Sequence, residues 1–68
     1  MNLKLYDFTV PELNVFRELC NFTPEELEYF ELRSNYKSNV EIAMTMNISE
    51  AKVSKLARKV KDKILRIV

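Results

Sequence analysis

The residues with the most evident chemistry are the cations near the carboxyl end of the chain. Between positions 52 and 66 there are seven lysines and arginines and one acid, Asp62. The two halves differ in the same sense, because residues 1–34 have a net charge of −4 and residues 35–68 have a net charge of +5. A basic end of this kind can face phosphate while the acidic end points away. The charges favour an anionic partner, although a basic face can also be an ordinary solvated surface.

Catalysis and metal binding lack their usual residues in this sequence. The chain has no histidine, no glycine and one cysteine, Cys20. A typical zinc site needs several cysteine or histidine ligands, and a nucleophilic cysteine needs a neighbouring base to activate it. We therefore expect no enzyme activity, no catalytic residue, no metal and no cofactor, and we interpret Cys20 as a small core residue.

The composition indicates one small all-α domain. The chain has 68 residues, of which 47% are hydrophobic, enough for a single core. Tight hairpins usually need glycine, so its absence favours helices joined by short polar turns. A lone cysteine permits no intrachain disulfide, and neither a secretory signal nor a run of ~20 apolar residues is present. We expect a cytoplasmic protein with no membrane partner.

Capping residues and apolar periodicity predict four helices within a single domain, residues 1–68, preceded by an extended amino-terminal segment. The predicted helices are 10–21, 24–35, 39–46 and 50–67. Their N-caps are expected at Thr9, Thr23, Ser38 and Ser49. A glutamate follows Thr23 and Ser38 at the third helical position, so both starts have the pattern of a capping box.

Apolar residues at helical spacing predict which faces are buried. In the second helix Leu27 and Phe30 are expected to face inward, with Tyr29 as a further candidate, and Phe22 is expected to pack on Leu27 before the helix begins. The four glutamates of this helix are interpreted as a solvated face. Met44 and Met46 are interpreted as core or gap-filling residues. The last helix has inward positions at Val53, Leu56 or Ala57, Val60, Ile64 and Ile67.

Residues 39–58 match the register of a helix-turn-helix. Two helices that cross steeply need a small residue where they approach, and Ala43 is placed to provide it. Asn47 follows where the turn needs a residue that tolerates a positive φ, and Ile48 then plugs the core. The same register also occurs in a plain helical hairpin, which stays the alternative interpretation.

One gapless stretch carries a further pattern. Its residues are Thr23-Pro24, Glu26, Glu28, Glu31-Leu32, Ser38-Asn39, Glu41-Ile42-Ala43, Ile48-Ser49-Glu50 and Val53. With them, residues 22–64 resemble the four-helix DNA-binding domain of LuxR-type regulators and, equally, region 4 of sigma-70 family factors. The resemblance implies a helix-turn-helix that binds promoter DNA in the major groove. The chain departs from both families at Tyr36 and Asn47, where glycines are usual.

Helical geometry divides the candidate DNA contacts into two sets. With Val53, Leu56 and Val60 inward, the outward face near the start of the last helix is expected to meet base edges of double-stranded DNA. The candidate base contacts are Glu50, Ala51, Ser54 and Lys55. The candidate phosphate contacts, which fix position without reading sequence, are Lys37, Ser38, Asn39, Lys52, Arg58 and Lys59.

Two alternatives remain open at this point. The same fold is also suited to a protein-interaction module that docks on RNA polymerase or another regulator through its acidic second helix. The end of the last helix, at Ile64, Leu65, Ile67 and Val68, must also be covered or stay exposed. Either the amino-terminal segment and first helix cover it, or a second subunit does in a homodimer.

Overall fold

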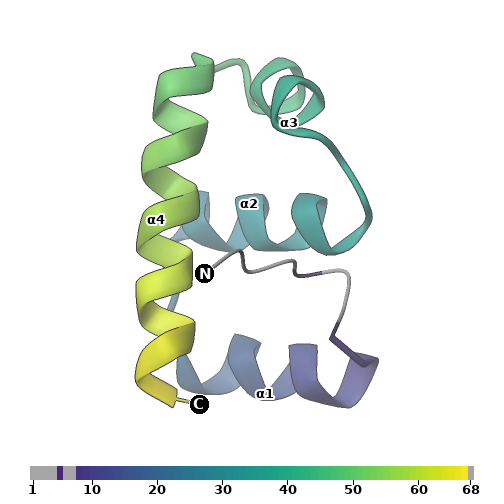
Figure 1. The fold of residues 1–68 in the computed structure, drawn as a ribbon, viewed down its shortest axis with the longest axis vertical. Helices are drawn as coiled ribbons and strands as arrows, with labels where there is room; N and C mark the ends of the chain where they lie inside the picture. Colours follow the sequence, from purple (N-terminus) through teal and green to yellow (C-terminus); the bar gives the residue numbers. More distant parts are fainter. Residues whose placement is uncertain (1–4, 6–7, 68) are drawn as a thin grey trace.

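The computed structural model describes Leu5 and residues 8–67, and this part of the chain contains four helices and no strand. The helices are α1 (Val10–Leu19), α2 (Pro24–Ser34), α3 (Asn39–Met46) and α4 (Glu50–Ile67). The long α4 runs along one side, and α1, α2 and α3 are stacked against it, each across its axis (Figure 1). The all-α fold with four helices is confirmed. The extended segment predicted before α1 falls mostly on residues outside the described part.

Each helix begins at a capped residue. The first three starts are complete capping boxes, in which a hydroxyl accepts from the backbone N–H of the third helical residue and that residue's glutamate accepts from the cap's own N–H. The pairs are Thr9–Glu12, Thr23–Glu26 and Ser38–Glu41. At α4 the Ser49 hydroxyl accepts from the backbone N–H of Lys52 at 3.1 Å. Local side chains thus satisfy N–H groups that the helix cannot bond itself.

Each of the first three helices is followed by a left-handed residue that is not glycine. Asn21, Tyr36 and Asn47 have φ values of 52°, 68° and 57°. Because a left-handed residue terminates the helical hydrogen bonding, α1 ends at Leu19 and α2 at Ser34, short of the predicted ends at 21 and 35. Such a conformation costs roughly 1–2 kcal/mol for a residue with a Cβ atom, and asparagine tolerates it best.

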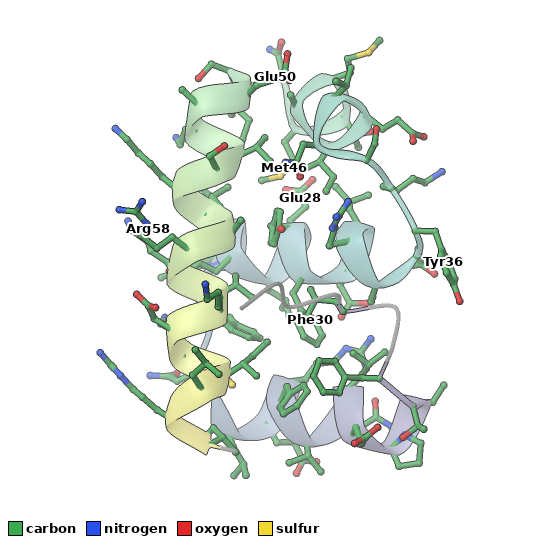
Figure 2. The ribbon with its side chains drawn as sticks, viewed as in Figure 1. Glu28, Phe30, Tyr36, Met46, Glu50 and Arg58 are labelled. Carbon is green, nitrogen blue, oxygen red and sulfur yellow. The ribbon has the colours of Figure 1, made fainter. Side chains whose placement is uncertain are left out.

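The core lies between α4 and the other three helices. Val53, Leu56, Val60 and Ile64 of α4 are buried in one cluster with Phe30 of α2, which projects toward α1 (Figure 2). The cluster also includes residues before and within α1, at Leu5, Leu13 and Phe16. Packing within the chain therefore covers Ile64. Leu65 and Ile67 stay exposed, and Val68 lies outside the described residues.

Three predicted interior positions were wrong, and one of them is Ile67, which is 40% exposed. Leu27 is 39% exposed, and its neighbour Glu26 is buried at 4%. Glu26 shares a face with Phe30, four residues on, whereas Leu27 is turned away by about 100°. Phe22, expected on Leu27, packs against Phe30 with 5.1 Å between ring centroids. Met44 is 77% exposed because it lies on the outer side of the short α3.

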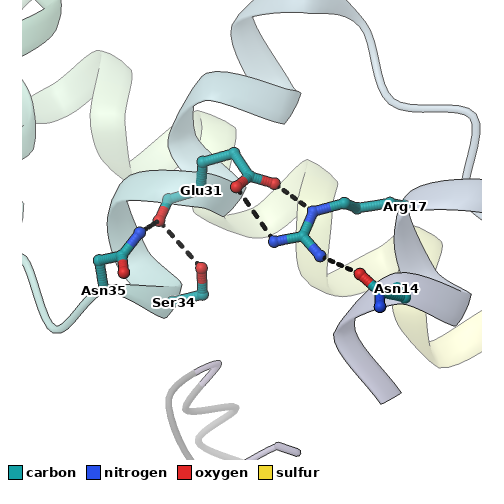
Figure 3. Close-up of polar contacts among 5 residues, drawn as sticks. All are labelled: Asn14, Arg17, Glu31, Ser34 and Asn35. Atoms are coloured by element: carbon teal, nitrogen blue, oxygen red, sulfur yellow. Dashed lines mark hydrogen bonds and ion pairs between the residues drawn. The ribbon is translucent and has the colours of Figure 1, made fainter. Parts of the chain in front are cut away.

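An ion pair joins α1 to α2. The guanidinium of Arg17 contacts both carboxylate oxygens of Glu31, donating from Nη2 to Oε2 at 3.0 Å (Figure 3). Arg17 also donates to Asn14 at 2.6 Å and lies over the Phe30 ring, 5.4 Å from its centroid. The hydrogen bond to Glu31 raises the pKa of Arg17. This bidentate pair fixes how α1 lies against α2.

A second ion pair joins the start of α2 to α4. The carboxylate of Glu26 accepts from the ammonium of Lys63 and, at 3.0 Å, from the backbone N–H of Thr23. The same ammonium donates to the carbonyl of Asn21 at 3.2 Å and lies 5.9 Å from the centroid of the Phe22 ring. The Glu26 carboxylate joins the α2 cap to α4, and its partner Lys63 adds the contact to the α1–α2 turn.

Removing Lys63 should destabilise the fold, because it leaves the carboxylate of Glu26 buried without its cationic partner. We expect Lys63→Ala to lower the free energy of unfolding by about 2 kcal/mol in urea titrations, below the 3–5 kcal/mol of fully buried pairs because Lys63 is partly exposed. The control is Lys59→Ala, which removes an exposed cation and should cost at most about 0.5 kcal/mol. Equal losses for the two variants would contradict a structural role for the pair.

The pair should also make stability depend on pH. Burial raises the pKa of Glu26, but the hydrogen bonds from Lys63 and Thr23 lower this pKa by a larger amount. The pKa of Glu26 is therefore below its ordinary value of 4.5. A lowered folded-state pKa contributes stability above that ordinary value and loses it as pH falls through the folded pKa. We expect the native protein to be more stable than Glu26→Gln at pH 7, with a difference that shrinks toward pH 3. A constant difference in urea titrations across this range would disprove the assignment.

Candidate nucleic-acid interface

The turn between α3 and α4 fixes the start of α4. Asn47 adopts the left-handed conformation, and its backbone N–H donates to the carbonyl of Met44 at 3.3 Å. The N–H of Ile48 donates to the carbonyl of Ala43 at 3.0 Å, which completes a Schellman motif. Ala43 is buried and Ile48 packs against the core, as the register predicted. In Figure 1, α3 is seen almost end-on beside the upright α4, so their axes cross steeply.

The outward side of α4 presents cations. Lys55, Arg58 and Lys59 are exposed and follow each other at spacings of three and one, which places them on one side of the helix. Arg58 points away from the other helices, and further nitrogen-tipped side chains project from the same side of α4 (Figure 2). Within Leu5 and residues 8–67, none of the three forms an ion pair. Their charge is therefore available to an anion in solution.

The four candidate base contacts are all exposed, but they do not share one direction. Ala51, Ser54 and Lys55 lie on the outward side of α4, within about 100° of each other around the helix. Glu50 is about 40° from Ser54 but about 140° from Lys55, and it borders a groove lined by Val40 and Met44 of α3. The four candidates therefore span about 140° of the α4 surface, with Glu50 at the edge next to α3.

The six candidate phosphate contacts fall into two groups. Arg58 and Lys59 are exposed cations on α4, and Asn39 is exposed at the first position of α3. The remaining three already have partners within the chain. Lys52 pairs with Glu25 at 3.0 Å, Lys37 pairs with Glu41 at 4.0 Å, and the Ser38 hydroxyl accepts from the N–H of Glu41 at 3.2 Å.

The role of the acidic residues of α2 was not predicted from the sequence. Three of its four glutamates, interpreted as a solvated face, are in ion pairs with other helices: Glu25, Glu26 and Glu31. Within the described ranges, Glu28 is exposed and has no ion pair. The sequence held one sign of these ion pairs, because Lys52 and Lys63 are about three helical turns apart and so share a side of α4. The sequence alone does not show that α2 lies against this side.

The rest of the described chain offers few reactive groups. The Cys20 thiol is buried, and this desolvation raises its pKa, which disfavours the reactive thiolate. Over Leu5 and residues 8–67 there is no cluster of three or more potential metal ligands among histidine, cysteine and acidic side chains. No helix in the same ranges combines the length and the apolar character needed to cross a membrane. The exposed face of α4 is therefore the strongest candidate site.

Comparison of the chain with family models, with curated proteins and with solved structures found no match. The resemblance to LuxR-type domains and to region 4 of sigma-70 factors therefore rests on the sequence pattern alone. What the candidate interface does must be inferred from its own geometry and charge.

The α3–α4 turn should tolerate only residues that accept a positive φ. Asn47→Gly should change the free energy of unfolding by less than about 0.5 kcal/mol, whereas Asn47→Val should lower it by roughly 1–2 kcal/mol because a β-branched side chain is strained there. Asn39→Val, a matched change on the exposed helical start of α3, should cost less than about 0.5 kcal/mol. Urea titrations that gave Asn47→Val the same small loss as Asn39→Val would argue against the left-handed turn.

Proposed function

We propose that the protein is a sequence-specific DNA-binding protein, a transcriptional regulator or sigma-like factor, in which α3, the Asn47 turn and α4 form a helix-turn-helix. The observation that carries the proposal is the exposed row of cations at Lys55, Arg58 and Lys59 on α4. This row begins within two turns of the α3–α4 turn. In a helix-turn-helix, that part of the second helix enters the major groove.

The charges and dimensions of α4 suit this role. The major groove is about 12 Å wide and admits an α-helix. Duplex DNA carries about one negative charge per 1.7 Å of its axis, so a row of unpaired cations gains counterion release when it docks. Side chains at the start of α4 can then meet base edges, with Lys55 donating to guanine and Ser54 to any base. Arg58 and Lys59, a turn further on, bind phosphate and fix the register.

Docking on RNA polymerase or another regulator through α2 is the less favoured function. That interaction would need a free acidic surface, and three of the four glutamates of α2 already pair with Arg17, Lys52 or Lys63. Only the exposed Glu28 has no such pair among the residues that the structure describes. The charge available to a partner is thus concentrated on α4 and is positive, which supports DNA as the partner.

The proposal is tested by titrating the protein into fluorescently labelled duplex DNA and measuring anisotropy. We expect binding at ~50 mM salt that weakens steeply toward ~200 mM, since phosphate contacts dominate affinity. A randomised pool of duplexes then identifies the preferred sequence. Absence of binding at the lower salt concentration would refute the proposal, because phosphate contacts are strongest there.

Because Lys55 is proposed to contact a base and Lys59 a phosphate, replacing each should affect DNA binding differently. Lys55→Ala should lower the affinity for the preferred duplex more than for a scrambled one, with a loss of about 1–3 kcal/mol in discrimination. Lys59→Ala should weaken both duplexes alike and reduce the salt dependence by about one phosphate contact. Both are measured by anisotropy on the two duplexes. Identical effects of the two variants on the affinity ratio would contradict these roles.

A further inference from the structure

Two adjacent glutamates at the start of α2 pair with two lysines of α4. Glu25 pairs with Lys52 at 3.0 Å, and Glu26 pairs with Lys63. The lysines are about three turns apart and lie on the same side of α4, next to the cationic row at its outward side. The start of α2 therefore supplies both anions that neutralise this side of α4 in the described chain.

These two ion pairs differ in how easily they can open. The side chain of Glu26 is 5% exposed, and its carboxylate also accepts from the α2 cap, so opening this pair would leave a charge buried. The side chains of Glu25 and Lys52 are 53% and 49% exposed, and among the described residues neither side chain has a second polar partner. Exposed pairs of this kind are weak and are screened by salt. The Glu25–Lys52 pair is therefore displaceable, whereas the Glu26–Lys63 pair is structural.

Lys52 lies where a backbone phosphate would be met. It is in the first turn of α4, directly after Ala51 and three residues before Lys55, on the flank of the face proposed to enter the groove. A phosphate oxygen and a carboxylate oxygen are both anionic acceptors for an ammonium donor. In the free protein the carboxylate of Glu25 is the acceptor at this ammonium, with 3.0 Å between Nζ and Oε2.

We propose that Lys52 is a phosphate-binding position for DNA and that Glu25 is an intramolecular competitor for it. This inference rests on the proposed function. Docked DNA displaces Glu25 from Lys52, and the affinity is reduced by the free energy of the exposed ion pair. Glu25 thus lowers the affinity for DNA through Lys52, without touching a base.

A matched pair of variants on α2 tests the competition. Glu25→Gln and Glu28→Gln remove the same charge from exposed positions of one helix, and Glu28 has no ion pair within the described residues. In anisotropy titrations on one labelled duplex, Glu25→Gln should bind about two- to fivefold more tightly than Glu28→Gln, the range expected from an exposed ion pair. In a Lys52→Ala background this difference should disappear. Lys52→Ala alone should weaken binding.

The possible failures of the two proposals can be told apart. If the unmodified protein binds no duplex, the proposed function fails and this inference fails with it. If the protein binds DNA but Glu25→Gln and Glu28→Gln have equal affinity, only the competition is overturned. A difference that persists in the Lys52→Ala background also overturns it, because Glu25 would then act through its general charge. Circular dichroism of each variant shows that loss of folding is not the cause.

Discussion

The burial of one face of α4 is the constraint on which the rest of the structure depends. Val53, Leu56, Val60 and Ile64 repeat at helical spacing, and all four are buried in the cluster that the other helices complete. Because α1, α2 and α3 all pack on this face, the opposite face is held in solvent along the whole helix. A single helix therefore supplies both the centre of the core and the exposed surface that bears the cations.

Ion pairs with α2 determine which cations of α4 remain available to an anionic partner. On the flank next to α2, carboxylates neutralise Lys52 and Lys63, and one of these pairs is buried and structural. On the outward side, where no helix lies, Lys55 and Arg58 have no ion pair in the described part of the chain. The modest net charge of +1 hides this separation, since acids concentrate on α2 and free cations on α4. The proposed function follows from where the charges lie more than from their sum.

Local features were predictable from the sequence, and features set by packing were not. Helix starts such as Thr23 could be placed because a capping box involves residues only three apart. The outward position of Lys55 follows equally from the periodicity of α4. The rotation of α2, which buries Glu26 and exposes Leu27, depends on Lys63, 37 residues away in sequence. No local pattern encodes that contact. The Glu25–Lys52 ion pair, which engages one of the predicted phosphate contacts, was unpredictable for the same reason.

We propose that the outward face of α4 and the adjoining α3–α4 turn form the surface that binds DNA. Titrating the ¹⁵N-labelled protein with duplex DNA at low salt, while following the backbone amide resonances, locates the binding surface. We expect the largest chemical-shift changes between Ala51 and Lys59 and near Asn39, while the amides of α1 change little. Shifts concentrated on α1, or no shift at low salt where phosphate contacts are strongest, would contradict it.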